Sequence, residues 1–218
     1  MINECKIKIT AHAGCMNTCM DSIEAIETGI EYKADIIEID LNIDKDSNLV
    51  LSHDIPNEEV EYPQFKRVLD IIKSQKDILL NIDVKNTIML RWLKNVLLEY
   101  NLLDRVFLTG LTYSDLVDNK KFLQEINCFI NLEISDIENM EFEKLIDKLE
   151  NLNIIGINID YKLINPEIIS VCRERKLLTS VWTVDNAEDM EKMIQLKVNS
   201  ITTNRVDILK KKISEVQY

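Results

Sequence analysis

Two histidines, His12 and His53, are the only histidines of this 218-residue chain, and both stand beside small or acidic residues. His12 lies in the segment Ala-His-Ala-Gly and His53 in Ser-His-Asp, and each segment follows a short apolar run that is typical of a β-strand. An imidazole titrates near neutral pH, so two histidines can supply a general base and a general acid. The sequence therefore places its few proton-transfer groups within residues 9–54.

Three carboxylates and one lysine stand at alternating positions of two further apolar runs. Glu38 and Asp40 share one face of the run 34–43, and Asp83 and Lys85 share one face of the run 78–85. Carboxylates that meet in one place repel each other unless a cation lies among them, and oxygen-only ligands favour Mg²⁺ or Ca²⁺ over zinc. A hard cation, two histidines and a lysine that pairs with an anionic substrate are suited to cleavage of a phosphate ester.

The same residues have a simpler explanation. The three carboxylates and Lys85 can form an internal salt-bridge network, while the two histidines are hydrogen-bonded loop residues and Trp182 belongs to the core. Residue types and spacing alone do not separate this explanation from a catalytic site.

Short β-type runs alternate with amphipathic helical patterns along the whole chain. We expect strands at 6–10, 34–43, 49–52, 78–85, 106–108, 128–134, 154–159, 178–184 and 200–203. We expect helices after an N-cap at Asn17 or Thr18 and up to a C-cap at Gly29, and at 63–73, 88–100, 114–126, 141–152, 166–176, 187–196 and 206–216.

About eight successive βα units in so short a chain indicate a parallel sheet closed into a TIM (β/α)8 barrel, with residues 1–218 as a single domain. A doubly wound open sheet is the alternative fold. It has little support, because no Gly-x-Gly-x-x-Gly follows the first strand. In a barrel, polar residues at the carboxyl ends of the strands meet at one mouth. The residues expected there are His12, Glu38, Asp40, His53, Asp83, Lys85, Trp182 and Asn204.

Composition narrows the possible partners. The formal net charge is −12, and such a surface repels phosphate backbones, so we do not expect nucleic acid as a partner. No run reaches the roughly 18 apolar residues of a membrane span, and the first ten residues lack the apolar core of a signal peptide. We therefore expect a cytoplasmic protein without a stable membrane anchor.

The chain has five cysteines, an odd and scattered set, which we expect to be reduced thiols. Cys15 and Cys19 are four residues apart, shortly after His12. A metal or redox role is the less favoured explanation for them, because no second Cys or His pair completes a zinc set.

Several of these segments together resemble the glycerophosphodiester phosphodiesterase family. They are Ala-His-x-Gly at 11–14, Asn17-Thr18, Glu38-Ile-Asp40, Leu-Ser-His53-Asp54, Val-Trp-Thr-Val-Asp-Asn-x-x-Asp-Met at 181–190 and Ile-Thr-Thr-Asn-Arg-Val-Asp at 201–207. The segments appear in order over nearly the whole chain, and the His, Glu-x-Asp and His-Asp set combined with Trp-Thr-Val is specific.

This resemblance implies a TIM barrel that hydrolyses glycerophosphodiesters, its small-molecule substrates, to an alcohol and glycerol 3-phosphate with a bound divalent cation, Mg²⁺ or Ca²⁺. By position, it implies that His12 and His53 are the acid–base pair and that Lys85 contacts the phosphate. It implies metal ligation by Glu38, Asp40 and Asp83, and it places Trp182 in the lining of the pocket.

The chain departs from the family pattern at three places. Ala13 replaces an arginine that binds the phosphate in the family, so we expect a larger and less positive space beside Gly14, with Lys85 and Arg205 as the nearby cations. Asp83 replaces a longer Glu. Only residues 55–62 follow His53-Asp54 where the family inserts a small helical cap, which predicts an open pocket. A weakened or inactive family member that binds a phosphorylated ligand is therefore the alternative function.

Overall fold

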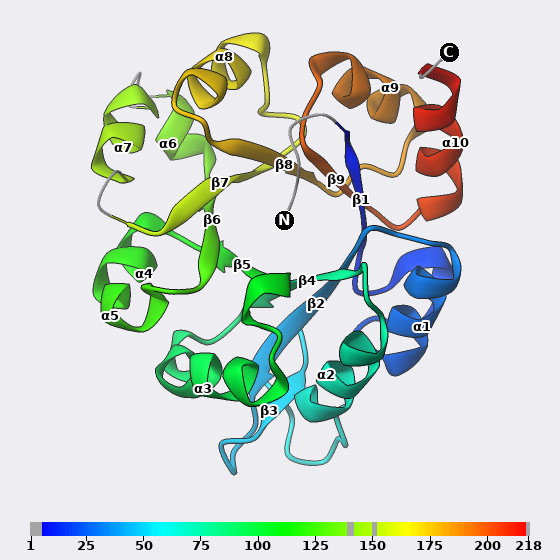
Figure 1. Ribbon diagram of the computed structural model, residues 1–218, viewed down its shortest axis with the longest axis vertical. Coiled ribbons are helices and arrows are strands. Elements are labelled where there is room, and N and C mark those ends of the chain that lie inside the picture. The colour runs from blue at the N-terminus through cyan, green and yellow to red at the C-terminus, as the bar shows by residue number, and fades with distance from the viewer. Residues whose placement is uncertain (1–5, 139–141, 150–151, 217–218) are drawn as a thin grey trace.

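The computed structural model describes residues 6–138, 142–149 and 152–216. Eight parallel strands close into a barrel, because β1 pairs with β9 on one side and with β2 on the other (Figure 1). The barrel strands are β1 (Lys8–Ala11), β2 (Ile36–Ile43), β4 (Leu79–Val84), β5 (Val106–Leu111), β6 (Asn127–Leu132), β7 (Ile154–Asp160), β8 (Leu178–Trp182) and β9 (Ser200–Thr203). The TIM-barrel prediction is confirmed.

A ninth strand, β3 (Leu49–Leu51), is antiparallel to the end of β2. The described residues between β3 and α2 (Phe65–Ser74) contain no helix, so the small helical cap of the family pattern is missing here. This short connection leaves the segment around His53 at the edge of the barrel.

A ring of helices surrounds the barrel (Figure 1). Besides α2, they are α1 (Ile23–Glu31), α3 (Leu90–Tyr100), α4 (Tyr113–Asp118), α5 (Lys120–Leu123), α6 (Ile134–Glu138), α7 (Phe142–Leu149), α8 (Pro166–Glu174), α9 (Ala187–Leu196) and α10 (Val206–Val216). Single 3-10 turns occur at η1 (Cys15–Asn17), η2 (Thr87–Met89) and η3 (Leu103–Arg105).

The helix predicted over 114–126 is two helices, α4 and α5, separated at Asn119. Asn119 is the C-cap of α4, and both its backbone N–H and its side-chain amide donate to the carbonyl oxygen of Asp115, at 3.1 and 2.9 Å. The predicted 141–152 helix is α7, and part of its predicted range lies outside the described residues.

The first helix begins and ends differently from the prediction. Its N-cap is Ser22, whose hydroxyl accepts the N–H of Ala25 at 3.0 Å, and not Asn17 or Thr18. Gly29 lies inside α1 and does not cap it. A Cβ at position 29 would approach Ile37 Cδ1 to 2.7 Å and Ala11 Cβ to 2.9 Å, so this glycine lets α1 pack closely on β1 and β2.

The period of two along the strands sorts apolar residues toward the helices and polar residues toward the barrel axis. In β2, Ile37 and Ile39 belong to the main apolar core, while Glu38 and Asp40 are buried on the opposite face. The helices contribute apolar stripes to the same core; in α2 the stripe is Phe65, Val68, Leu69 and Ile72. Each of these side chains contributes roughly 1.5–3 kcal/mol through burial.

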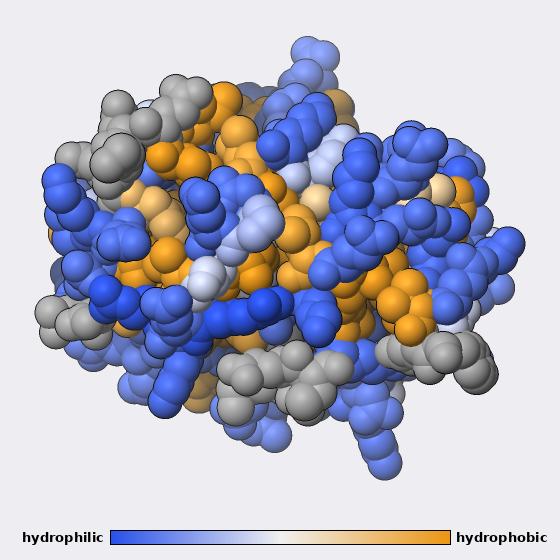
Figure 2. All heavy atoms as spheres, turned by 90° about the horizontal axis from the view of Figure 1, so that it is seen from above, coloured by the Kyte–Doolittle hydropathy of each residue, from blue (hydrophilic) through white to orange (hydrophobic). Residues whose placement is uncertain are grey.

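Hydrophilic side chains dominate the outer face seen in Figure 2, with apolar groups visible between them. Among the described residues, no helix has both the length and the apolar character needed to cross a bilayer.

Candidate active site

A cavity of about 440 Å³ opens at the carboxyl ends of the barrel strands. Seven of the eight residues that the sequence analysis expected at the mouth line it, and Asn204 does not. Its wall consists of His12, Glu38, Asp40, His53, Asn81, Asp83, Val84, Lys85, Thr109, Gly110, Asn131, Asn158, Trp182, Thr183 and Thr202. The structure thus brings together predicted residues from β2, β4 and β8 and from the ends of the loops that follow β1, β3 and β4, as expected for one mouth of a TIM barrel.

Glu38, Asp40 and Asp83 each offer a carboxylate oxygen, and these oxygens lie within 4.8 Å of one another. Strand register explains their meeting, because β2 and β4 pair Asp40 with Asp83 directly. Burial raises the pKa of Glu38 well above its ordinary value, and the charges of Asp40 and Asp83 raise it further. The N–H of Ala13 opposes this shift, since it donates to Glu38 Oε2 at 2.8 Å.

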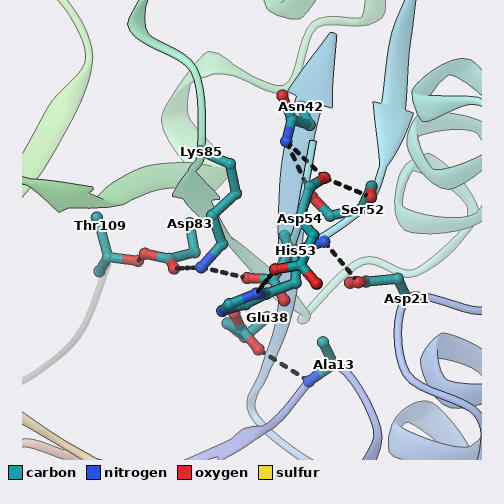
Figure 3. A network of polar contacts seen from close by, with 12 residues as sticks. Ala13, Asp21, Glu38, Asn42, Ser52, His53, Asp54, Asp83, Lys85 and Thr109 are labelled. Atoms are coloured by element: carbon teal, nitrogen blue, oxygen red, sulfur yellow. Dashed lines mark hydrogen bonds and ion pairs between the residues drawn. The ribbon is translucent and has the colours of Figure 1, made fainter. Parts of the chain in front are cut away.

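Lys85 forms ion pairs with two of these carboxylates, at 3.0 Å to Asp40 Oδ1 and 2.6 Å to Asp83 Oδ2 (Figure 3). Burial lowers the pKa of this ammonium, but the two carboxylates outweigh burial and leave the pKa raised. The internal salt-bridge network that the sequence left open is therefore present in part.

One lysine nevertheless leaves the cluster negative when all three carboxylates are ionised. Asp40 is 2% exposed, and its Oδ2 has no hydrogen-bond partner among the described residues. A buried carboxylate oxygen without a partner is costly, and a hard cation is the partner that such an oxygen prefers. The donor set fits Mg²⁺ or Ca²⁺.

His12 is oriented by a chain of hydrogen bonds. Asp185 Oδ2 accepts the side-chain N–H of Asn204 at 2.8 Å, which turns Asn204 Oδ1 toward His12 Nδ1 at 3.0 Å. The carboxylate of Asp185 can only accept, so the side-chain NH2 of Asn204 faces it and the amide oxygen of Asn204 faces His12. That oxygen is an acceptor, so His12 donates from Nδ1, and the neutral ring then carries a free lone pair on Nε2. Asn204 was expected at the mouth, but the orienting role of Asp185 was not predicted.

His53 is the more exposed of the two histidines, with 57% of its side chain accessible. Its Nδ1 lies 2.9 Å from Asp54 Oδ1, which accepts the ring proton when Nδ1 carries it. The backbone N–H of His53 donates to Asp21 Oδ2 at 2.8 Å (Figure 3).

Asp21 is a further acidic residue of the site that sequence reasoning missed. Burial, followed by the charge of Asp40, raises its pKa from 3.8 to about 7, and the N–H of His53 opposes this. Its Oδ1 and Oδ2 of Asp40 are both buried and have no donor when both carboxyls are ionised, whereas a protonated Asp21 can hydrogen-bond to Asp40, which also raises the pKa of Asp21. Asp21 lies in a loop with no strand or helix period, so only its short distance in sequence from His12 could have drawn attention to it.

The rest of the cavity wall is polar and fixed by hydrogen bonds. The Thr109 hydroxyl lies 2.9 Å from both Asn81 Oδ1 and Asp83 Oδ1. Asn131 Oδ1 accepts from the backbone of Gly110 at 2.8 Å and from the amide of Asn158 at 3.1 Å.

Gly110 has a φ of +77°, and a Cβ there would lie 2.6 Å from Asp83 Oδ1, so position 110 requires glycine. Trp182 ends β8 at the rim and is 37% exposed.

The position of the missing family arginine does not open into the cavity. Ala13 is 4% exposed and is not part of the cavity wall. The larger space predicted beside Gly14 is not found, because Met20 Cα would lie 3.4 Å from a Cβ at position 14. Arg205 pairs with Asp207 at 3.0 Å. Lys85 is therefore the one lysine or arginine of the cavity wall among the described residues.

Cys15 and Cys19 do not form a metal or redox site with each other. The Cys15 thiol is buried and donates to the carbonyl of Ala25 at 3.6 Å, while Cys19 is exposed. Among the described residues, the acidic cluster is the one group of three or more potential metal ligands, and it contains no cysteine.

Comparison with known proteins agrees with this geometry. Residues 55–208 match the Glycerophosphoryl diester phosphodiesterase family, a span that includes Asp83, Lys85 and Trp182. A glycerophosphodiester phosphodiesterase of Caldanaerobacter subterraneus subsp. tengcongensis is 26% identical over 241 residues, which cover 94% of this chain and 96% of that protein.

Solved structures share the fold. A glycerophosphodiester phosphodiesterase from Parabacteroides distasonis has a TM-score of 0.82 at 20% identity and covers 98% of this chain and 99% of its own. An Oleispira antarctica phosphodiesterase in complex with the product sn-glycerol-3-phosphate has a TM-score of 0.78 at 15% identity and covers 96% of this chain and 97% of its own. With a family match over more than half of its length, the chain belongs to the glycerophosphoryl diester phosphodiesterase family.

Proposed function

We propose that this protein hydrolyses glycerophosphodiesters to an alcohol and glycerol 3-phosphate with the help of a divalent cation. One observation carries the proposal: three carboxylates, a lysine and both histidines of the chain line one cavity at the barrel mouth. Family membership gives the reaction class, and the Oleispira antarctica relative supports the product, since its structure contains sn-glycerol-3-phosphate.

Glu38, Asp40 and Asp83 would hold the cation, which we propose to be Mg²⁺ or Ca²⁺. When bound, such an ion supplies positive charge that polarises a phosphoryl oxygen and stabilises the charge of the transition state. The N–H of Ala13 fixes Glu38, and Lys85 and Thr109 fix Asp83, so the ligand oxygens are held before an ion arrives.

The two histidines divide the proton transfers. His12 donates from Nδ1 to Asn204, so its Nε2 is available to accept the proton of the attacking oxygen. The Nδ1 of His53 lies beside the carboxylate of Asp54, which orients the ring, and His53 gives a proton to the leaving oxygen. Single His→Ala changes commonly cost about 10²–10⁴ in rate for such roles.

Lys85 and Trp182 bind the substrate. Lys85 is an ammonium at the cavity wall that a phosphate oxygen can share with Asp40 and Asp83. The exposed ring of Trp182 offers an apolar surface at the rim, against which the glycerol or the alcohol can pack. The polar side chains of Asn131 and Asn158 lie on the same wall and are suited to hydroxyl groups.

The decisive experiment is a screen of glycerophosphodiesters, including glycerophosphocholine and glycerophosphoethanolamine, with Mg²⁺, with Ca²⁺ and with EDTA. Release of glycerol 3-phosphate is the readout. We expect metal-dependent release that the His12→Ala and His53→Ala variants each lose. Full turnover of His53→Ala would show that the two-histidine mechanism is wrong.

Ala13 in place of the family arginine favours a second function, that of a protein that binds a phosphorylated ligand without turning it over. Calorimetry with glycerol 3-phosphate separates the two functions, because the second predicts binding in the presence of metal without hydrolysis of any diester in the screen. For a weakened enzyme, Ala13→Arg should raise kcat/KM. Since Ala13 is buried, its new side chain must displace neighbouring atoms, and an unchanged or lower kcat/KM would favour the altered-ligand function.

A further inference from the structure

Asp21 is bonded to both loops that carry the histidines. Its backbone N–H donates to the carbonyl oxygen of Ala13, the residue after His12, at 3.0 Å. Its carboxylate Oδ2 accepts the backbone N–H of His53 at 2.8 Å, across 32 residues of sequence. Asp21 therefore joins the loop after β1 to the loop after β3.

The loop around His53 is secured on its other side by β2. Ser52 N–H donates to the Asp40 carbonyl at 3.1 Å, and the side-chain amide of Asn42 donates to the carbonyl oxygens of Ser52 at 3.4 Å and Asp54 at 3.0 Å. These bonds hold the residues before and after His53. Asp21 accepts the N–H of His53 itself, and Figure 3 shows it on the side opposite to Asn42.

The side chain of His53 makes few contacts with the residues around it. It is 57% exposed, and its recorded hydrogen-bond partner is Asp54, whose side chain is 94% exposed. A ring with so few contacts depends on its backbone for its position, and the hydrogen bond to Asp21 is the one that holds the backbone N–H of His53 itself.

The backbone of Asp21 suits this role. Its φ is +57°, in the left-handed region, where Asp and Asn cost less than other residues with a Cβ. Asp and Asn combine this conformation with a side-chain acceptor at low cost, whereas glycine has the conformation without the acceptor.

We propose that Asp21 is a positioning residue that fixes His53 relative to His12 and thereby sets the geometry of the acid–base pair. The proposal rests on the proposed function in so far as both histidines act on one phosphate. A misplacement of a catalytic group by about 1 Å costs roughly 100-fold in rate, which is the scale on which such a residue acts.

Three variants separate this role from a contribution to stability. Asp21→Asn keeps an acceptor oxygen and tolerates the left-handed conformation. Asp21→Gly tolerates the conformation but removes the acceptor. Lys33→Gly is the matched control, because Lys33 also has a positive φ, of +60°, is exposed, and lies beyond the other end of α1.

The first readout is the NMR spectrum of the ring nitrogens in protein labelled with ¹⁵N-histidine. The chain has two histidines, so the spectrum contains two ring systems that the single His→Ala variants assign. Asp21→Gly should shift or broaden the His53 signals and leave those of His12 in place, whereas Asp21→Asn and Lys33→Gly should leave both. This readout needs no turnover, so it decides the proposal even if the enzyme assay fails.

The second readout is steady-state kinetics at saturating metal. Asp21→Gly should lower kcat by roughly 10- to 100-fold with KM changed less than about threefold, and Asp21→Asn should restore most of kcat. Unchanged His53 signals in folded Asp21→Gly would overturn the proposal. Equal losses of kcat in Asp21→Asn and Asp21→Gly would also overturn it, because the shared acceptor would then be irrelevant. If Asp21→Gly does not fold, Asp21→Ser, whose hydroxyl is one atom shorter, is expected to show the same His53 changes, and unchanged signals would again contradict the proposal.

Discussion

Replacement of Glu38 by Gln should remove metal binding and leave the fold intact. Glu38 is 6% exposed, and its Oε2 accepts the N–H of Ala13 at 2.8 Å. Gln has nearly the same shape, and its amide oxygen can accept the same hydrogen bond. The substitution therefore changes the charge of the cluster while it changes the packing very little.

The expected loss of affinity follows from charge and distance. A divalent cation and one carboxylate attract each other by about 14 kcal/mol at a metal–oxygen distance of about 2.3 Å and an effective dielectric constant of about 20. Glu38 must first release its proton, because its pKa is raised, and the Gln oxygen remains a weak ligand. A net loss of about 3–4 kcal/mol remains, or roughly 100- to 1000-fold in Kd.

The stability of the metal-free protein should change little on the same substitution. Burial and the neighbouring carboxylates raise the pKa of Glu38 and so disfavour its charged form, which lessens the cost of a neutral Gln at this position. We expect the free energy of unfolding in EDTA to change by less than about 1 kcal/mol.

Calorimetric titration of Mg²⁺ and Ca²⁺ into both proteins, with urea unfolding in EDTA, tests both parts. Glu27→Gln is the matched control, because Glu27 is an exposed glutamate of α1. Equal metal affinity of wild type and Glu38→Gln would refute the ligand assignment. If Glu38→Gln loses several kcal/mol of unfolding free energy in EDTA, the argument that the Glu38 carboxylate destabilises the metal-free protein is refuted.

Three further predictions concern pH, packing and thiols. Burial raises the pKa of Asp21 from 3.8 to about 7, so the metal-free folded state binds the Asp21 proton more tightly than the unfolded chain does. The stability of the folded state should therefore fall as pH rises through this window, and EDTA-treated protein should melt at a higher temperature near pH 5 than near pH 8. An Asp21→Asn variant whose melting temperature depends on pH as strongly as that of wild type would contradict this. Gly156→Ala should lower the free energy of unfolding by about 1–3 kcal/mol or more in urea titration, since its Cβ would clash with the Leu178 carbonyl oxygen. Gly14→Ala, whose Cβ has its nearest neighbouring atom at 3.4 Å, should cost much less, and equal costs would be incompatible with this packing argument. Burial raises the pKa of the Cys15 thiol to about 11 and of the Cys128 and Cys172 thiols to about 12. Mass spectrometry after alkylation of the native protein should therefore find the exposed Cys19 modified and these three thiols protected until denaturant is added. Fast alkylation of any of the three in native protein would speak against their burial.

The local pattern of the chain was enough for most of the secondary structure. The bounds of α9, β9 and α10 agree with the prediction, and the alternation along 34–43 correctly placed Glu38 and Asp40 on one inward face. Such features depend on residues two to four positions apart, and their types record the burial of one face directly. The family was also evident, because its motifs are short and contiguous in sequence.

The first and last residues of the helices were predicted less well from the same local pattern. The apolar stripe continues from α4 into α5, so periodicity could not show the break at Asn119. Gly29 looked like a helix end, yet close packing on Ile37 and Ala11 explains it. In both cases a contact outside the local pattern decided the conformation.

Only the tertiary structure decided how the site is held. His12 and Asn204 are 192 residues apart and meet because β1 pairs with β9, whereas Asp21 and His53 are 32 apart and meet because β1 and β3 both pair with β2. It also decided that Lys85 pairs with two carboxylates while Asp40 keeps a buried oxygen without a partner. The sequence by itself determined which chemical groups the mouth contains, because strand period fixes the face of each side chain. Their partners depend on which strands and loops become neighbours in space, and that is settled only when the eight strands close.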